Sequence, residues 1–411
     1  MPVASGHSLV QQFSAHCSER ELKDWSEQAR CELEGPITFG FIFATPDAQS
    51  RIRDVIEVVR IYAQVPVLIG CSSEAVLAND REFENEGGFS VALHALPETT
   101  ARAFYLPPRV FEDSAAAALE AFFGEAPKHA NAWMLFAAPT GAVSESWMHS
   151  WDRATGGTVT VGGFASGMVD DEVALYCGGR VYTEGAVALC LEGRVTVAPV
   201  ASQACRPVGS PWTITRASEN VIHQIGNRPI LEVLRDTLEK MSTEDQKQAR
   251  GNIFIGLVMD EYKPNFGTGD FLVRNLAAID PKSGAVAIAS EPRVGQNLQF
   301  QIRDATVASV DFEQLLEQRI KELRDSKIYG ACLCDCIGRG YSLFGVPDHD
   351  VRLIRGIFPD LPVGGLFCNG EFGPVHGRTV LHGYTASLAL FVERRGLKSA
   401  KSDFEESFEL L

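Results

Sequence analysis

The sequence predicts an α+β protein built of two related halves, each with mixed, largely antiparallel sheets flanked by helices, stacked as an αββα-like sandwich. The chain opens with a strand–helix–strand pattern, continues with glycine-punctuated β-rich runs, and repeats this mixture in its second half. At 411 residues with 45% apolar side chains, it is long enough for about two or three domains with a sizeable core.

The first half begins with a helical lead-in over residues 1–35, which Gly35 and Pro36 end. Residues 37–46 are typical of a buried strand, and residues 47–63 have the apolar spacing of an amphipathic helix. A second apolar strand follows at 65–74. Because a helix joins the two strands, we expect them to be parallel.

Glycine-rich turns divide the later part of this half. Residues 172–200 contain short β-rich runs separated by glycines, which is typical of hairpins. The run 203–216 carries three structure-breaking residues and should end the first half. We therefore expect one domain over 36–222 and a second over 223–393.

The second half alternates strands and helices. Residues 228–240 predict a helix, with Pro229 in its first turn, and 242–251 predict a polar connector. Strands are expected at 253–260, 271–280, 285–290, 297–304, 328–336, 361–368 and 385–392, and further helices at 312–325 and 352–359. Residues 394–411 should form a charged tail.

Charge and targeting signals exclude several classes of protein. The chain has 37 basic and 53 acidic residues, a net charge of −16, which argues against binding to nucleic acid or to an anionic membrane. The first twenty residues lack a signal peptide, and no apolar run has the roughly 18–20 residues of a membrane span. We expect a cytoplasmic protein whose ten cysteines are reduced.

Three segments share one pattern, in which apolar residues lead to a glycine and then to small or polar residues: 66–74, 160–167 and 362–371. At a strand end, a glycine lets the backbone approach another group closely. The three could therefore converge on a pocket, or they could be strand ends of a duplicated scaffold.

Common catalytic and nucleotide-binding motifs are absent from the sequence, and Gly338-Arg339-Gly340 lacks the third glycine of a dinucleotide site. Residues that could bind a ligand or catalyse a reaction are most concentrated between residues 332 and 384. In a strand, Cys332, Cys334 and Cys336 would share one face. Zinc binding with Cys368 and His382 matches no common spacing, so buried, apolar cysteines are the favoured interpretation.

Arg339 and Glu371 each follow a buried strand in a glycine-rich turn. An arginine fork suits a carboxylate and a glutamate suits an ammonium, so the pair could bind a small zwitterion. The competing interpretation is an internal Arg–Glu pair that joins two loops. A cysteine-dependent enzyme, using Cys368 or Cys336 with His382, is a further alternative.

These motifs resemble the FIST family, with its N-terminal and C-terminal FIST domains. The N-terminal resemblance rests on VPVLIGCSSE, TVTVGGFASG, TEGAVALCLEG and QACRPVG before WTITRASENVIHQI. The C-terminal resemblance rests on CDCIGRGYSLFG, PVGGLFCNGEFGPV and LHGYTASLALF. Together they span about residues 37 to 393, and the chain has no kinase, cyclase, chemotaxis or F-box segment.

The resemblance implies a non-enzymatic sensory protein of signal transduction that binds a small, amino-acid-like ligand and signals through a partner protein. It places the ligand-site positions at Arg206, Arg339, Gly340, Cys368, Glu371 and Gly373. Some bacterial members bind haem, for which His223, His376 and His382 are candidates here; otherwise no cofactor is expected. The other alternative is a scaffold whose acidic tail, with Asp403, Glu405, Glu406 and Glu409, meets a basic partner.

Overall fold

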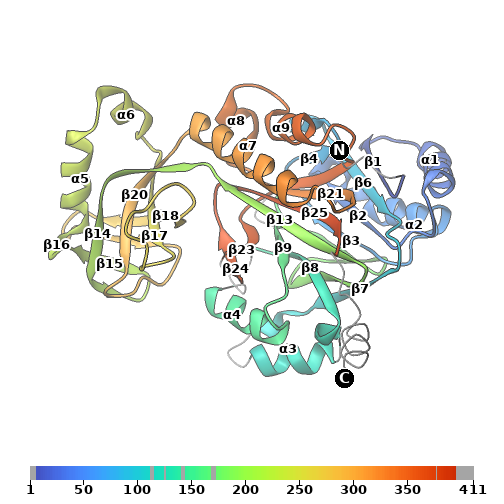
Figure 1. The fold of residues 1–411 in the computed structure, drawn as a ribbon, viewed down its shortest axis with the longest axis horizontal. Helices are drawn as coiled ribbons and strands as arrows, with labels where there is room; N and C mark the ends of the chain where they lie inside the picture. Colours follow the sequence, from blue (N-terminus) through green and yellow to red (C-terminus); the bar gives the residue numbers. More distant parts are fainter. Residues whose placement is uncertain are drawn as a thin grey trace, which may run out of the picture.

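A computed structural model describes residues 6–111, 115–124, 126–139, 144–167, 173–375 and 377–394 (Figure 1). It confirms the α+β class, with mixed and mostly antiparallel sheets flanked by helices. Three six-stranded sheets form a body, and a fourth sheet forms a separate lobe, on the left in Figure 1. In these described ranges, the helices are all too short or too polar to cross a bilayer.

The first sheet contains, in spatial order, β1 (Ser8–Ser14), β6 (Gly88–His94), β2 (Phe39–Ala44), β3 (Leu68–Ser72), β10 (Leu175–Cys177) and β11 (Arg180–Tyr182). Strands β2 and β3 are parallel, as predicted, and the other pairs are antiparallel. Helices α1 (Glu19–Glu32) and α2 (Ile52–Tyr62) cover its outer face, with the 3₁₀ turn η1 (Pro46–Arg51) before α2. The Ser18 side chain caps α1 by accepting from the Glu21 N–H.

The second sheet has the order β24 (Arg378–His382), β23 (Glu371–Val375), β9 (Thr160–Phe164), β8 (Ala130–Ala137), β12 (Ala186–Gly193) and β7 (Thr99–Leu106). Its parallel pair is β8–β9. Helices α3 (Ala115–Phe123) and α4 (Glu145–Ala154) cover the outer face, with the 3₁₀ turns η2 (Pro108–Phe111) and η3 (Ala126–Lys128) nearby in sequence.

The third sheet has the order β13 (Val195–Gln203), β25 (Thr385–Glu393), β21 (Ile328–Cys336), β22 (Val363–Cys368), β4 (Val76–Ala78) and β5 (Arg81–Phe83). Its parallel pair is β21–β22. Helices α7 (Ala305–Glu322) and α9 (His349–Ile357) pack on its outer face, and the short α8 (Gly340–Phe344) precedes α9.

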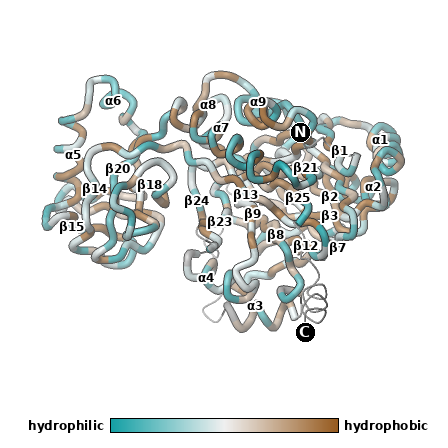
Figure 2. The backbone as a smooth tube through the Cα atoms, in the orientation of Figure 1, coloured by the Kyte–Doolittle hydropathy of each residue, from teal (hydrophilic) through white to brown (hydrophobic). Residues whose placement is uncertain are grey.

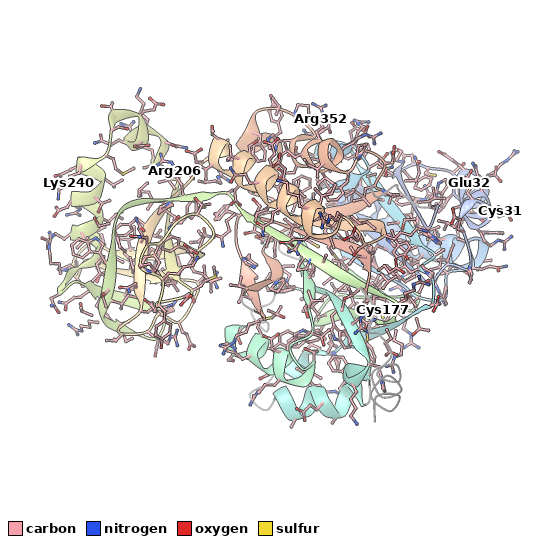
Figure 3. The ribbon with its side chains drawn as sticks, in the orientation of Figure 1. Cys31, Glu32, Cys177, Arg206, Lys240 and Arg352 are labelled. Atoms are coloured by element: carbon pink, nitrogen blue, oxygen red, sulfur yellow. The ribbon has the colours of Figure 1, made fainter. Side chains whose placement is uncertain are left out.

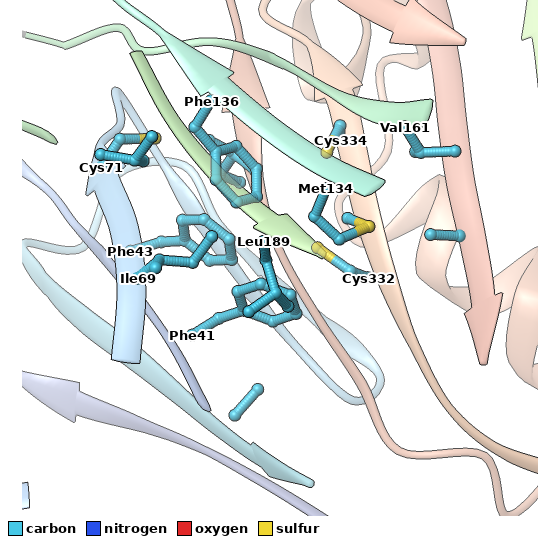
Figure 4. Close-up of a cluster of buried hydrophobic side chains, with 14 of the residues drawn as sticks. Phe41, Phe43, Ile69, Cys71, Met134, Phe136, Val161, Leu189, Cys332 and Cys334 are labelled. Carbon is cyan, nitrogen blue, oxygen red and sulfur yellow. The ribbon is translucent and has the colours of Figure 1, made fainter. Parts of the chain in front are cut away.

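The inner faces of all three sheets meet in one hydrophobic core. Alternate residues of the central strands supply it, among them Phe41, Phe43, Met134, Phe136, Cys332 and Cys334 (Figure 4). Hydrophobic residues accordingly concentrate in the strands of the body, while outer helices such as α1 and α6 are hydrophilic (Figure 2). Any two sheets thus form helix–sheet–sheet–helix layers around a shared interior.

The body consists of three related units. Each has a strand–helix–strand segment, then a hairpin, then a strand that returns to its own sheet: β2 to β6, β8 to β12 and β21 to β25. Each hairpin crosses to another sheet, so β4–β5 lies beside β22, β10–β11 beside β3, and β23–β24 beside β9. The structure therefore repeats three times in the body, where the sequence led us to expect two related halves.

This repetition explains the three similar sequence segments, because they contain β3, β9 and β22, the second strand of each unit. In each, a glycine pairs with the first strand of the unit: Gly70 with Ile42, Gly162 with Leu135 and Gly365 with Leu333. A Cβ at any of these glycines would overlap the partner's carbonyl oxygen. Their strand ends do converge, since Ser73 and Ser166 both donate to the Phe367 carbonyl.

The fourth sheet is a closed barrel inserted between the second and third units. Its order is β14 (Cys205–Ser218), β20 (Asn297–Arg303), β17 (Ile253–Val258), β18 (Phe271–Asp280), β19 (Ala285–Ile288), β15 (Val221–Ile225) and β16 (Arg228–Pro229). Pairing of β14 with β15 closes the ring. The barrel has its own core, to which α5 (Ile230–Lys240) contributes, and α6 (Thr243–Gln248) follows.

Three predicted segments differ from the structure. Ser8–Ser14, placed in the helical lead-in, is strand β1, because its pairing with β6 outweighs local preference. Residues 203–216 do not end a structured half, since most of them form β14; the register shift between Val208 and Trp212 accommodates Gly209 and Pro211. The polar connector contains α6, capped by Ser242. The expected boundary between 222 and 223 falls inside β15.

Candidate functional site

The third hairpin carries polar residues where the other two hairpins carry apolar or aromatic ones. Glu371 lies opposite His382 across β23–β24, and it also pairs with Gly163 of β9. In the first unit the equivalent pair is Val76 and Phe83, and in the second it is Leu175 and Tyr182. The fold itself therefore does not require a carboxyl group or an imidazole at these positions.

The end of β21 likewise carries a polar residue where the other two units carry an apolar one. Gly70, Gly162 and Gly365, the close-approach glycines, each pair with a residue on the first strand of their unit. Two positions further along that first strand lie Ala44, Ala137 and Asp335, respectively. Asp335 is completely buried. Cys336 follows it and pairs in register with Cys368. The third unit thus concentrates ionisable groups at the ends of β21 and β22.

Arg339 is completely buried and bound by two aspartates. Its Nε donates to Asp350 Oδ2 at 2.7 Å and its Nη2 to Asp350 Oδ1 at 3.0 Å, a bidentate pair. Asp335 Oδ1 lies 3.2 Å from the same Nε. Burial opposes ionisation of Asp350, but the guanidinium outweighs it and holds the pKa of Asp350 well below its usual range.

Glu82 links this cluster to the first unit's hairpin. Its Oε1 accepts from the Asp350 and Val351 N–H groups at the start of α9. Burial and the charge of Asp350 raise the pKa of Glu82 to about 7. Among the described residues, Glu82 Oε2, Asp335 Oδ2 and Arg339 Nη1 have no hydrogen-bond partner.

Glu371 is also completely buried, yet it is not paired with Arg339. Its carboxyl accepts from the Gly370 and Thr385 N–H groups, each at 3.2 Å. Burial raises the pKa of Glu371 to about 8, despite these hydrogen bonds and a further one with Cys336. Glu371 is therefore mainly protonated at neutral pH. The structure shows neither an Arg339–Glu371 ion pair nor an open fork on Arg339 within the described residues.

The remaining predicted positions serve different parts of the molecule. Gly340 has φ +60° and lies against the Glu84 carboxylate, and Gly373 lies against Ser387 and His382. Cys368 is in the core, and burial raises its pKa to about 12. Arg206 binds Asp304 and Asp245 at the barrel, separate from α9, where Arg352 is labelled (Figure 3).

The three candidate haem-binding histidines are not brought together in the described structure. His223 lies on β15 and hydrogen-bonds Ser218 at 2.8 Å. His376 lies outside the described residues. His382 is 3% exposed, and burial lowers its pKa to about 4 with a further contribution from Arg274. The pocket beside it measures about 240 Å³.

Tyr384 joins the body to the barrel. Its φ is +57°, a conformation that non-glycine residues rarely adopt. Its hydroxyl donates to Asn275 of the barrel at 2.8 Å, and its carbonyl accepts from the Ala204 N–H. Its ring packs on Phe254 and beneath Arg303, which in turn donates to the Gly338 carbonyl. The barrel joint and the Arg339 turn are thus in direct contact.

A cleft of about 820 Å³ separates the barrel from the second sheet. The barrel ends of β17 and β18 and the loop 290–296 form one wall; α4 and the β23–β24 hairpin form the other. In Figure 1 the β23–β24 hairpin lies on the side of the body that faces the barrel. Charged side chains of both signs line the cleft: Arg274, Arg293, Arg378, Glu219, Asp260 and Glu291, together with His149.

Sequence reasoning missed Asp335, Asp350 and Glu82, the groups that hold Arg339 and its helix. Asp335 was detectable as the single charge inside the apolar run 328–336. Asp350 and Glu82 carry no local signal, because only the tertiary fold brings them to β21. No group of three or more potential metal ligands gathers anywhere in the described ranges. All ten cysteines are free thiols, and only Cys31 is exposed.

Fold and site together define a three-unit α+β protein with an inserted barrel and a charged cleft between its lobes. Residues 38–228 match the FIST N domain, and residues 231–374 match the FIST C domain. The chain therefore belongs to the FIST family, whose domains are sensory domains of signal transduction, and the resemblance seen in the motifs is confirmed. The boundary between the two matches falls inside the barrel.

Similar proteins occur in mycobacteria. An uncharacterized protein of Mycobacterium tuberculosis is 35% identical over 376 residues, which cover 91% of this chain and 96% of that protein. An uncharacterized protein of Mycobacterium bovis is 34% identical over 368 residues, covering 89% and 94%. Both similarities extend across the units and the barrel.

Proposed function

We propose that this protein is a non-enzymatic cytoplasmic sensor that binds a small, amino-acid-like ligand in the cleft between the barrel and the β23–β24 hairpin. The single observation that carries the proposal is the charge pattern of this cleft. Its lining residues include three arginines and three carboxylates together with apolar side chains. Sites for small molecules usually combine apolar walls with a few polar groups that orient the ligand.

A zwitterion suits this lining because its two charges need opposite partners. Arg378 is exposed at the start of β24, and Arg274 stands on β18 across the cleft. The Arg378 guanidinium can receive a carboxylate through parallel N–H donors, whereas Arg274 already donates to the Val273 and Leu381 carbonyls. Glu291 and Asp260 on the barrel side can receive an ammonium. By contrast, Asp350 already occupies the fork of Arg339.

Ligand binding in this cleft should change the contacts between the body and the barrel at Tyr384. The cleft has one wall on each lobe, so a ligand that contacts both walls favours the arrangement in which they are close. The hairpin that forms the body wall starts at Glu371 and leads directly to Tyr384, which contacts the barrel and the Arg339 turn. A partner protein that binds only one arrangement of the two lobes would then bind in response to the ligand.

Isothermal titration calorimetry of the full chain against a panel of amino acids tests the proposal. We expect at least one saturable heat of binding, weakened at least tenfold in Arg378→Gln because one charge-assisted contact is lost. Arg180→Gln is the matched control, since Arg180 is an exposed arginine at the tip of the equivalent β10–β11 hairpin. Its affinity should equal that of the wild type.

The outcomes distinguish the other interpretations. No binding anywhere in the panel at millimolar sensitivity, with the fold intact, would overturn the amino-acid proposal. A Soret band after reconstitution with haem, lost in His223→Ala, His376→Ala or His382→Ala, would instead support a haem protein. A flat ligand screen together with capture of a basic protein partner would favour the scaffold.

A further inference from the structure

We propose that the contact between strand β5 and the α8–α9 segment is a proton-sensitive clasp, which is closed when Glu82 carries a proton. The clasp consists of residues 81–84 of the first unit and residues 339–351 of the third. These two segments lie far apart in the sequence, since 266 positions separate Glu82 from Asp348. The inference concerns how two units hold together, so it goes beyond the proposed ligand cleft and does not depend on it.

Hydrogen bonds join the two segments in both directions. The Glu82 N–H donates to Asp348 Oδ1 at 2.9 Å. In return, the Asp350 and Val351 N–H groups donate to Glu82 Oε1 at 2.9 and 3.2 Å. The N–H groups at the start of an α-helix need acceptors from outside the helix. A carboxyl group of the first unit therefore provides these acceptors for α9, which belongs to the third.

Within the described residues, the side chains that precede α8 and α9 do not cap these helices. Asp348 precedes α9 with φ +59°, which non-glycine residues rarely adopt, and its side chain makes no hydrogen bond to a helix N–H. Its carboxylate binds the Glu82 N–H instead. Arg339 likewise provides no cap for α8, where the Tyr341 N–H donates to Glu84 Oε1 at 2.8 Å. Both helix starts thus depend on residues 82 and 84.

Buried carboxyl groups outnumber buried positive charges around the clasp. Glu82, Asp335 and Asp350 are at most 6% exposed, and Arg339 is the buried cation beside them. One guanidinium cannot balance three buried carboxylates, so at least one carboxyl keeps its proton. Asp350 occupies the fork of Arg339 as an ion. Glu82 can hold a proton without losing a bond, because its Oε2 has no hydrogen-bond partner among the described residues.

The pKa of Glu82 agrees with this arrangement. Burial and the charge of Asp350 raise it to about 7 in the closed clasp, from an ordinary value of 4.5. Burial also raises the pKa of Asp335. The charged and titratable groups around Glu82 come from several elements: Arg81 and Glu84 on or next to its own strand, Asp335 at the end of β21, Arg339 before α8, and Asp348, His349 and Asp350 at the start of α9.

The clasp should open more readily as the pH rises. In the open form water solvates Glu82, so its pKa falls back toward 4.5. Above that pH the open form releases a proton that the closed form retains, which favours opening until Glu82 ionises in the closed form as well. Between pH 6 and 8 the ratio of open to closed clasp should rise about tenfold. Opening would loosen the Arg339 turn, whose Gly338 carbonyl accepts from Arg303 of the barrel.

Hydrogen–deuterium exchange of the full chain, followed by mass spectrometry, provides the test. Exchange is compared at pH 6 and 8 after correction for the intrinsic pH dependence of amide exchange. We expect the protection of residues 340–357 to fall about tenfold in the wild type, since protection reports the ratio of closed to open forms. Protection of α1 and α5, which lie outside the clasp, should change less.

Glu82→Gln isolates the titration of Glu82 from that of its neighbours. The amide keeps the shape of the protonated carboxyl and an oxygen for the α9 N–H groups, but it cannot ionise. Protection of residues 340–357 should then be equal at the two pH values. Glu86→Gln, which removes an exposed carboxylate that binds Arg81, is the matched control and should follow the wild type.

Two results of the exchange experiment would overturn the proposal. One is an equal pH dependence in Glu82→Gln and the wild type, and the other is a loss of protection spread evenly over α1, α5 and the clasp. Carbon-13 NMR of the glutamate carboxyls gives a second measurement that does not require Glu82→Gln to fold. In Glu371→Val one glutamate signal should still titrate near pH 7. The absence of such a signal would also overturn the proposal.

Discussion

Glu371 and His382 face each other across the third hairpin, in the register positions that Val76 and Phe83 hold in the first. Both are buried, and neither forms an ion pair within the described part of the chain. Burial raises the pKa of the carboxyl to about 8 and lowers that of the imidazole to about 4. Two groups that would attract each other as ions are thus both uncharged at neutral pH.

Replacement of Glu371 by the residue of the first unit, Glu371→Val, should change how stability depends on pH. In the wild type the carboxyl keeps its proton until pH about 8, whereas it ionises near 4.5 when unfolded. Between these values the unfolded chain releases a proton that the folded chain retains, so the free energy of unfolding falls by up to about 1.4 kcal/mol per pH unit. The variant should lack this fall.

Urea denaturation at pH 5.5, 6.5 and 7.5 measures the difference between wild type and variant, so that other titrating groups cancel. Glu57→Gln, on the exposed face of α2, is the control and should parallel the wild type. Equal pH slopes for wild type and Glu371→Val would show that the carboxyl ionises freely in the folded protein.

Loss of the aspartate that holds Arg339 should be severe. Asp350→Ala leaves a guanidinium that is 0% exposed without its bidentate partner. Removing one member of a buried ion pair costs roughly 3–5 kcal/mol, because the remaining charge stays desolvated. Thermal and urea unfolding measure the loss. The Arg352–Asp348 pair, whose arginine is exposed, gives the comparison: Arg352→Gln should cost at most about 1 kcal/mol. Similar losses for the two variants would contradict the prediction.

The three close-approach glycines should be equally intolerant of a methyl group. In Gly70→Ala, Gly162→Ala and Gly365→Ala the new Cβ overlaps a backbone carbonyl of the neighbouring parallel strand, which cannot move without breaking the ladder. We expect each to cost at least about 3 kcal/mol, at the upper end of overpacking effects. Differential scanning calorimetry measures the change.

A helical glycine gives the matched control. Gly356 is exposed inside α9 with open space at its Cβ position, so Gly356→Ala should stabilise the protein by up to about 1 kcal/mol. If only one of the three strand glycines proved sensitive, the structural equivalence of the units would be disproved.

The barrel should be removable as a module. Ala204 and Asp304 stand at its two crossings, and the Asp304 N–H donates to the Ala204 carbonyl at 2.9 Å. A short glycine linker can therefore join them in place of residues 205–303. Because the body core excludes barrel residues, the shortened chain should unfold cooperatively, with lower stability from the lost Tyr384 contacts. Circular dichroism that shows no cooperative transition would mean that the barrel is integral to the body.

The sequence predicted elements whose apolar patterns are local and clear, whereas β6, β7, β8, α3 and α4 were not predicted. The strands at β2, β3, β21 and β22 are continuous apolar runs, and the helix at α5 has apolar residues at helical spacing. Strand β1 and the long β14 were missed because partners distant in sequence stabilise them. Of the predicted site residues, Arg339 and Glu371 are completely buried, and their partners were not foreseeable from the sequence.

The sequence alone determined the α+β class, the FIST family and the presence of three similar strand ends, because each follows from residues that are close together in the sequence. Only the tertiary structure decided that Asp335 and Asp350 hold Arg339, that Glu371 is buried against the Gly370 and Thr385 N–H groups, and that His382 lines a pocket. The physical reason is that the charge state and partners of a buried group depend on what surrounds it in space. Those surroundings here come from three units and an inserted barrel spread over nearly the whole chain.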